Sequence, residues 1–224
     1  MSPVGHAQQR SGLAEAHVNR AKLLLAKGDL AGAIASYDDA IKVNPEWSEA
    51  YLKRGIALRM QGALDKAIED FDKATTLDPA STRNNRAVAD AYENHGQIQL
   101  SNLRPEDAIV DFEKALRIYP AGTRPYFDRG EARILIEDFA RAIEDFDTYL
   151  TKEKWDAFNK ALAQANRSLA KHLLGRDDEA KRDLKSIASL PTEAREAVLR
   201  HIEEVEVRLM IMRHIRTQRR KTIA

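Results

Sequence analysis

A pattern of small and aromatic residues recurs along this chain, and its period limits the possible folds more than any other feature. The pattern Ala-Ile-x-x-aromatic-x-x-Ala, ending in proline, spans Ala67–Pro79 and has a counterpart 34 residues earlier at Ala33–Pro45. It returns 41 residues later at Ala108–Pro120, then at Ala142–Phe146, and in degraded form at Ala180–Leu184. A unit of this length cannot bury its apolar face alone, so successive units are expected to stack and share one core.

Each unit has the spacing of two helices joined by a tight turn. Tyr51, Gly55 and Leu58 fall at i, i+4 and i+7, and the residues of Ala67–Ala74 share a face in the same way. Gly62 suits the left-handed end of a first helix, and Pro79 stops the second. With 43% hydrophobic residues, ten glycines and seven prolines, the composition also favours a helical chain with a packed core.

These coincident positions resemble the tetratricopeptide repeat (TPR), and the segment Tyr51–Ala57 (Tyr-Leu-Lys-Arg-Gly-Ile-Ala) resembles bacterial members. The resemblance implies an all-α protein, a right-handed α-solenoid of about five helical hairpins plus a C-terminal capping helix. The expected organisation is a disordered segment at 1–12, a TPR array at 13–190, and a C-terminal helix with a basic tail at 191–224. The units are expected at about 14–47, 48–81, 82–122, 123–156 and 157–190.

The third and fourth units depart from the family pattern. Unit three carries seven extra residues, which we place at Ala80–Arg86, and has Leu103-Arg104-Pro105 where the glycine between helices is usual. Unit four ends at Thr148–Thr151 without a proline, so its second helix is expected to run longer or to meet the next helix differently. These irregularities affect the expected shape of the binding groove more than the fold.

In this family the first helices of the hairpins line a concave groove, so the resemblance implies that a partner segment binds there. An extended or helical peptide suits the mixture of apolar and charged groups at these positions. Three apolar members, Val18, Leu52 and Ile56, have the alternative of packing against a neighbouring hairpin. The expected groove residues are Val18, Asn19, Lys22, Leu52, Lys53, Ile56, Arg59, Met60, Glu93, Asn94, Gln97, Arg124, Phe127, Asp128 and Glu131.

One TPR subtype binds the acidic tails of heat-shock chaperones through a carboxylate clamp of lysine, asparagine and arginine. The matching positions here hold Val18, Lys22, Lys53, Asp90 and Asn94. The clamp is absent, and Asp90 would repel a carboxylate. We therefore do not expect this kind of co-chaperone function.

The C-terminal helix is a second candidate surface. Val198, Ile202, Val205, Leu209 and Met212 form one apolar stripe, which suits a helix that seals the last hairpin. The run Leu209, Met210, Ile211 and Met212 is apolar on all sides, which favours a partner or self-association surface. From Arg213 to Ala224 there are five basic residues and no acidic one, without the interleaved aromatics of nucleic-acid binders.

The sequence therefore predicts a protein-binding scaffold whose partner lies in the groove, or alternatively a structural subunit that assembles with itself or another protein through the C-terminal helix. Catalytic motifs, metal-ligand spacings and cysteines are lacking, so we expect no enzyme, cofactor, metal or small-molecule substrate. Carboxylates such as Glu69, Asp70 and Asp72 are interpreted as a solvated outer face. Neither nucleic acid nor a membrane span is expected. The expected compartment is the cytoplasm, or the periplasm if an N-terminal export signal was trimmed.

Overall fold

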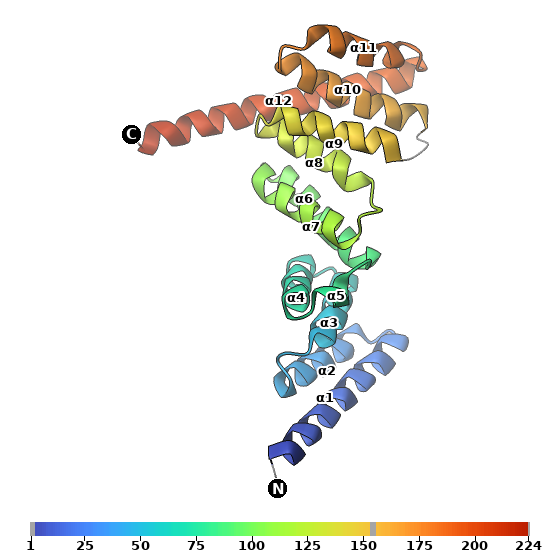
Figure 1. Ribbon diagram of the computed structural model, residues 1–224, viewed down its shortest axis with the longest axis vertical. Helices are drawn as coiled ribbons and strands as arrows, with labels where there is room; N and C mark the ends of the chain where they lie inside the picture. Colours follow the sequence, from blue (N-terminus) through green and yellow to red (C-terminus); the bar gives the residue numbers. More distant parts are fainter. Residues whose placement is uncertain (1–2, 153–155, 224) are drawn as a thin grey trace. The chain divides into compact units, whose positions relative to one another are not determined.

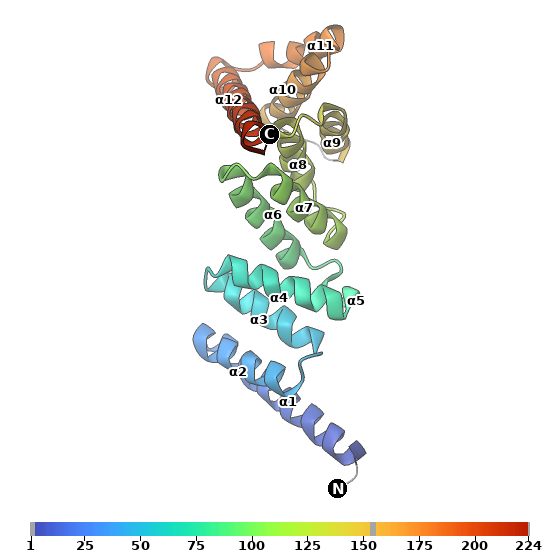
Figure 2. The same cartoon turned by 90° about the vertical axis from the view of Figure 1, so that its left-hand side faces the viewer.

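The computed structural model describes the backbone of residues 3–152 and 156–223, and the side chains of 11–152 and 156–218 apart from residue 186. Within these ranges the chain is helical, without a β-strand, as the repeat pattern predicted. The helices pair as hairpins that follow one another along the chain (Figures 1 and 2). They are α1 (Pro3–Ala26), α2 (Leu30–Val43), α3 (Ser48–Met60), α4 (Leu64–Leu77), α5 (Pro79–Thr82), α6 (Arg86–Ser101), α7 (Pro105–Ile118), α8 (Arg124–Leu135), α9 (Phe139–Lys152), α10 (Ala157–Leu173), α11 (Asp177–Ala188) and α12 (Thr192–Ile223).

The chain divides into two compact units. Unit 1 comprises Met1–His95 with Arg117–Pro120, and unit 2 comprises Gly96–Leu116 with Ala121–Ala224. The helix bounds bear on two expectations from the sequence. Helix α1 already begins at Pro3, within the segment 1–12 that was expected to be disordered, of which residues 1–2 lie outside the described part. Helix α9, expected to run longer or to meet the next helix differently, has 14 described residues, as many as α2, α4 and α7, and residues 153–155, which follow it, lie outside the described part.

The close approach of the two helices in a hairpin depends on a glycine that faces an aromatic ring. A Cβ added at Gly55 would lie 2.7 Å from Cε1 of Phe71, and one added at Gly130 would lie 2.7 Å from Cζ of Phe146. These rings are fully buried. The repeated glycine and aromatic of the sequence pattern are therefore direct packing partners.

The turns between the paired helices keep one geometry even where glycine is missing. Gly62 has φ +87°, and the corresponding residues of the third and fourth hairpins, Leu103 and Glu137, have φ 56° and 66°. A non-glycine residue in this left-handed region is disfavoured by about 1 kcal/mol or more. Leu103 and Glu137 adopt this left-handed conformation because the turn must bring the second helix back against the first, as the turn at Gly62 does.

The seven-residue insertion of unit three forms a short helical turn. Asp78 accepts a hydrogen bond from the Ala80 amide at 3.0 Å and so caps α5, and Thr82 is fully buried. Asn84, with φ 56°, donates its amide to the carbonyl of Ile118 at 2.8 Å. The insertion is thus fastened to the end of α7 within unit 1.

In unit 2 the last helix packs along earlier helices. Figures 1 and 2 both show α12 beside α8 and α10, and the three helices contact one another. Val205, Leu209 and Met212 belong to the same apolar core as Phe127 and Ile134 of α8. Helix α12 therefore covers the fourth hairpin as well as the fifth. Within the described ranges, no helix combines the length and hydropathy that a bilayer crossing requires.

Candidate protein-binding surfaces

In unit 1 the expected groove residues form a face that we call the first-helix face, carried by α1, α3 and the beginning of α6. Most of these side chains reach solvent. Met60 is 59% exposed. Two apolar members, Val18 and Leu52, are instead buried in the core. For these two residues the structure shows the alternative considered from the sequence, packing within the hairpins. The side chains that remain exposed or half-buried are Asn19, Lys22, Lys53, Ile56, Arg59, Met60, Glu93 and Asn94.

The first-helix face carries charges of both signs. Lys22 of α1 and Glu49 of α3 form an ion pair at 3.1 Å, with both side chains nearly half exposed. This pair joins the two helices across the face. Lys53 and Arg59 follow on α3, and the Nε of Arg59 makes no hydrogen bond within the described residues. A ligand that matched this face would need acidic as well as apolar groups.

The corresponding positions of α8, in unit 2, are covered. Phe127, Asp128 and Glu131 are buried, with exposed fractions of 3%, 4% and 8%. Asp128 accepts hydrogen bonds at 3.0 Å from both Arg124 and Gln97. Burial raises the pKa of Asp128 although the charge of Arg124 opposes the rise. These three residues, expected to contact a partner, instead contact other parts of unit 2, and only Arg124 stays largely exposed.

Helix α12 provides much of this cover. Glu131 receives a hydrogen bond from Asn166 Nδ2 at 3.1 Å and pairs with Nε2 of His201 at 2.5 Å. The ring of His201 lies 6.2 Å from that of Phe127, centroid to centroid. Burial lowers the pKa of His201, but the hydrogen bond and charge of Glu131 outweigh it, so the pKa is raised above 6.5. The raised pKa favours the imidazolium–carboxylate pair between α12 and α8 to a higher pH than a free imidazole would allow.

The apolar run near the C-terminus divides between two sides of α12. Leu209 and Met212 are buried in the unit 2 core, whereas Met210 is 65% and Ile211 41% exposed. The expectation that all four residues form one partner surface is therefore corrected, because a helix places i and i+3 on one side and the residues between them elsewhere.

Part of the basic end of α12 is also engaged. Arg213 lies 3.2 Å from Glu137, and Arg216 donates a hydrogen bond to the carbonyl of Leu135 at 2.9 Å. Both contacts reach the end of α8 and its turn. The side chains beyond residue 218 lie outside the described part of the structure.

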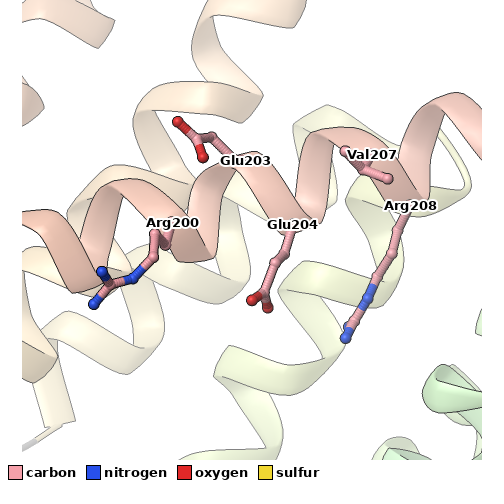
Figure 3. Close-up of a pocket in the computed structure, with 5 residues that line it drawn as sticks. All are labelled: Arg200, Glu203, Glu204, Val207 and Arg208. Carbon is pink, nitrogen blue, oxygen red and sulfur yellow. The ribbon is translucent and has the colours of Figure 1, made fainter.

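An open hollow runs along one stretch of α12 (Figure 3). It is lined by Arg200, Glu203, Glu204, Val207 and Arg208. In Figure 3 Glu204 and Arg208 point to the same side of the helix, and Glu203 points away from them. The hollow presents charges of both signs beside an exposed valine, which suits a protein surface better than a small apolar ligand.

Sequence reasoning missed a network of buried ion pairs. Asp70, expected on a solvated face, is 4% exposed and accepts two hydrogen bonds from Arg54, while Asp38 of the preceding hairpin accepts a third at 2.5 Å. Burial raises the pKa of Asp70 more than Arg54 lowers it. Glu69 and Asp72 were also expected on the solvated face. Glu69 is exposed, whereas Asp72 is half-buried and accepts a hydrogen bond from the hydroxyl of Tyr92 at 2.9 Å.

The network repeats in unit 2. Arg129 binds Asp145 of its own hairpin and approaches Glu113 of the preceding one, and Arg167 likewise joins Asp183 and Asp147. The sequence did contain a signal, since each arginine stands directly before the small residue of the first helix and 16 positions before its buried aspartate. These arginines link consecutive hairpins, so their role is structural. The described residues contain no group of three side chains suited to hold a metal ion.

Comparison with known proteins agrees with this architecture. The tetratricopeptide repeat model matches residues 18–82 and 89–121. A DnaJ homolog subfamily C member 7 homolog of Schizosaccharomyces pombe is 28% identical over 155 residues, which are 64% of this chain and 32% of that protein. The mouse tetratricopeptide repeat protein 36 is 36% identical over 81 residues, 36% of this chain and 42% of that one. The chain thus spans less than half the length of these curated relatives.

Solved structures show the same fold. The crystal structure of MamA matches with a TM-score of 0.54 and 23% identity, covering 79% of this chain and 90% of that one. YrrB, described as a TPR protein with an unusual peptide-binding site, matches with a TM-score of 0.56 and 20% identity, covering 84% and 90%. The repeated glycine–aromatic packing, the family matches and these structures agree: the chain contains tetratricopeptide repeats at residues 18–82 and 89–121 and has the helical-hairpin fold of such proteins.

Proposed function

We propose that this chain is a scaffold that binds a segment of another protein on the first-helix face of unit 1. TPR proteins generally mediate protein–protein interaction, and this role agrees with the family. The observation that carries the location is the difference between two sets of equivalent positions. Lys53 and Ile56 of α3 are half-buried and reach solvent, whereas the equivalent residues of α8, Asp128 and Glu131, are buried, and Glu131 pairs with His201 of the chain's own α12.

The chemistry of the face suggests the kind of segment. Lys53 and Arg59 would pair with acidic side chains. Ile56 lies between them in sequence and Met60 directly follows Arg59, and both have apolar surface to cover. A segment with acidic residues flanking one or two apolar ones would satisfy both groups at once. Charge pairs at such a rim mainly set specificity and association rate, and the apolar contact would contribute to the lifetime of the complex.

A peptide selection tests the proposal. Random peptides displayed on phage are selected on the full chain, and the peptides recovered are synthesised and titrated by fluorescence anisotropy. The double variant Lys53→Glu/Arg59→Glu should weaken binding at least about tenfold, which corresponds to about 1.4 kcal/mol. Far-UV circular dichroism should stay unchanged, because both side chains lie outside the core.

The matched control reverses two other basic residues of unit 1. Lys66 and Lys73 are exposed on α4, away from the first-helix face. The variant Lys66→Glu/Lys73→Glu makes the same change in net charge and should bind like the unaltered chain. Equal weakening by both variants would point to a nonspecific charge effect, and undiminished binding by Lys53→Glu/Arg59→Glu would place the ligand elsewhere.

A further inference from the structure

Helix α12 presents apolar side chains on two sides, of which the core uses one. Val198, Val205, Leu209 and Met212 are buried. On the outer side Leu199 is 49%, Val207 50%, Met210 65% and Ile211 41% exposed. Sealing the last hairpins accounts for the first set only. A second set of this size on one helix indicates a contact that the single chain does not make.

The charge of α12 changes sign along its length. From residue 192 to 206 there are five acidic and two basic residues, and from 207 to 223 there are six basic and no acidic ones. Two such helices side by side in the same direction would place like charges together. In opposite directions each acidic half would meet a basic half, so the charge pattern complements an antiparallel copy of itself.

We propose that α12 is a self-association surface, on which α12 of a second copy of this chain docks antiparallel, with the two-fold axis between Val207 and Met210. This arrangement sets Val207 of one copy against Met210 of the other. Glu204 then faces Arg213 of the second copy, and Arg213 retains exposed surface although it also contacts Glu137 of its own chain. The interface is isologous, as two-fold homodimers require.

The exposed apolar side chains are few, so the pairing is expected to be reversible and to depend on ionic strength. Charge complementarity between exposed groups is screened by salt over about 8–10 Å. The inference does not depend on the proposed peptide-binding face, because that face lies on α1, α3 and α6 of unit 1. Either proposal can fail while the other stands.

Sedimentation velocity on the full chain over a range of concentrations tests the association. The unaltered chain should form a concentration-dependent dimer that dissociates as salt is raised. Met210→Glu should remain monomeric, because it places a carboxylate at the centre of the interface. Leu23→Glu is the matched control, since Leu23 has the same 65% exposure on α1, and it should dimerise like the unaltered chain.

Cysteine crosslinking tests the direction, and the chain has no native cysteine to interfere. In the antiparallel arrangement two copies of residue 210 lie near the axis, so Met210→Cys should form a disulfide-linked dimer under mild oxidation. Two copies of residue 199 would be about 28 Å apart along the helix at about 1.5 Å rise per residue. Leu199→Cys should therefore not crosslink.

Three outcomes would overturn the proposal. They are a monomer at every concentration, a dimer that Met210→Glu leaves intact, and crosslinking of Leu199→Cys as efficient as that of Met210→Cys. The first would mean that a different protein covers this side of α12, the second that association uses another surface, and the third that the helices pair in parallel.

Discussion

Arg54 of α3 donates two hydrogen bonds to the buried carboxylate of Asp70 in α4, from Nε at 2.8 Å and from Nη2 at 2.6 Å. The side chain of Arg54 is 22% exposed and that of Asp70 is 6% exposed, so solvent screens the pair only weakly. The planar guanidinium matches the carboxylate in a way that a lysine could not. The same arginine reaches Asp38, so one residue joins two hairpins of unit 1.

We predict that Arg54→Met lowers the free energy of unfolding by about 3 kcal/mol, because removing one partner leaves a buried carboxylate without compensation. The loss should be smaller at about pH 5 than at about pH 8. Burial already raises the pKa of Asp70 and Arg54 lowers it, so without Arg54 the carboxyl protonates more readily in the folded state, and stability recovers as the pH falls. Urea unfolding at both pH values measures this. The control Arg86→Met removes an exposed pair at 3.9 Å and should change stability by less than about 0.5 kcal/mol.

Gly130→Ala should also destabilise the chain. The new Cβ would lie 2.7 Å from Cζ of Phe146, whose ring is buried and packs edge-on against Phe127 at 5.7 Å between centroids. Overpacking of this kind costs about 1–3 kcal/mol, more than the helix propensity that alanine gains. Gly12→Ala in α1 meets no atom within 4 Å, so it should stabilise slightly. Equal melting temperatures for the two variants would contradict the packing role of Gly130.

The contact between α12 and α8 should weaken as the pH rises. Burial lowers the pKa of His201, but Glu131 raises it more strongly, so the folded pKa exceeds the unfolded value of 6.5. A raised histidine pKa contributes stability that is complete below the unfolded pKa and is lost as pH rises through the folded pKa. Glu204 acts in the same direction as Glu131, and Arg208 opposes it.

Amide hydrogen exchange in α12 measures this effect. Protection should fall as the pH rises above the unfolded histidine pKa of about 6.5, beyond the intrinsic change in exchange rate. In His201→Gln the fall should disappear, with weaker protection at the lower pH. His214→Gln, which removes an exposed imidazole from the same helix, should behave like the unaltered chain. A pH dependence that persists in His201→Gln would assign the effect to another group.

Two valines on α12 separate its inner and outer sides. Val205 is 2% exposed within the core of unit 2, whereas Val207 is 50% exposed. We predict that Val205→Asp lowers the free energy of unfolding by more than about 3 kcal/mol, because it buries an unpaired charge. Val207→Asp should change it by less than about 0.5 kcal/mol in dilute solution. Similar losses of unfolding free energy in the two variants would mean that α12 does not pack with Val205 inward and Val207 outward.

The repeat architecture was predictable because its determinants are local and recurrent. The glycine and aromatic of one hairpin, such as Gly130 and Phe146, are 16 positions apart, and each recurrence adds independent support. The insertion at 80–86 was located for the same reason, since it interrupts the period. The burial of Asp70 was not predicted, because its signal is an arginine 16 positions earlier, which becomes visible only when the three arginine–aspartate pairs of different hairpins are compared.

By itself, the sequence determined which segments form helices and which small and aromatic residues pack within each hairpin, because helical periodicity is set by the chain within each segment. It also showed that α12 must bury a stripe containing Val205, Leu209 and Met212. Only the tertiary structure decided what that stripe packs against. The contact between His201 and Glu131 joins residues 70 positions apart, and no periodicity encodes such a distance. The packing position of α12 follows from the apolar surface that the hairpins leave uncovered. That position decides which expected groove residues stay accessible to a partner.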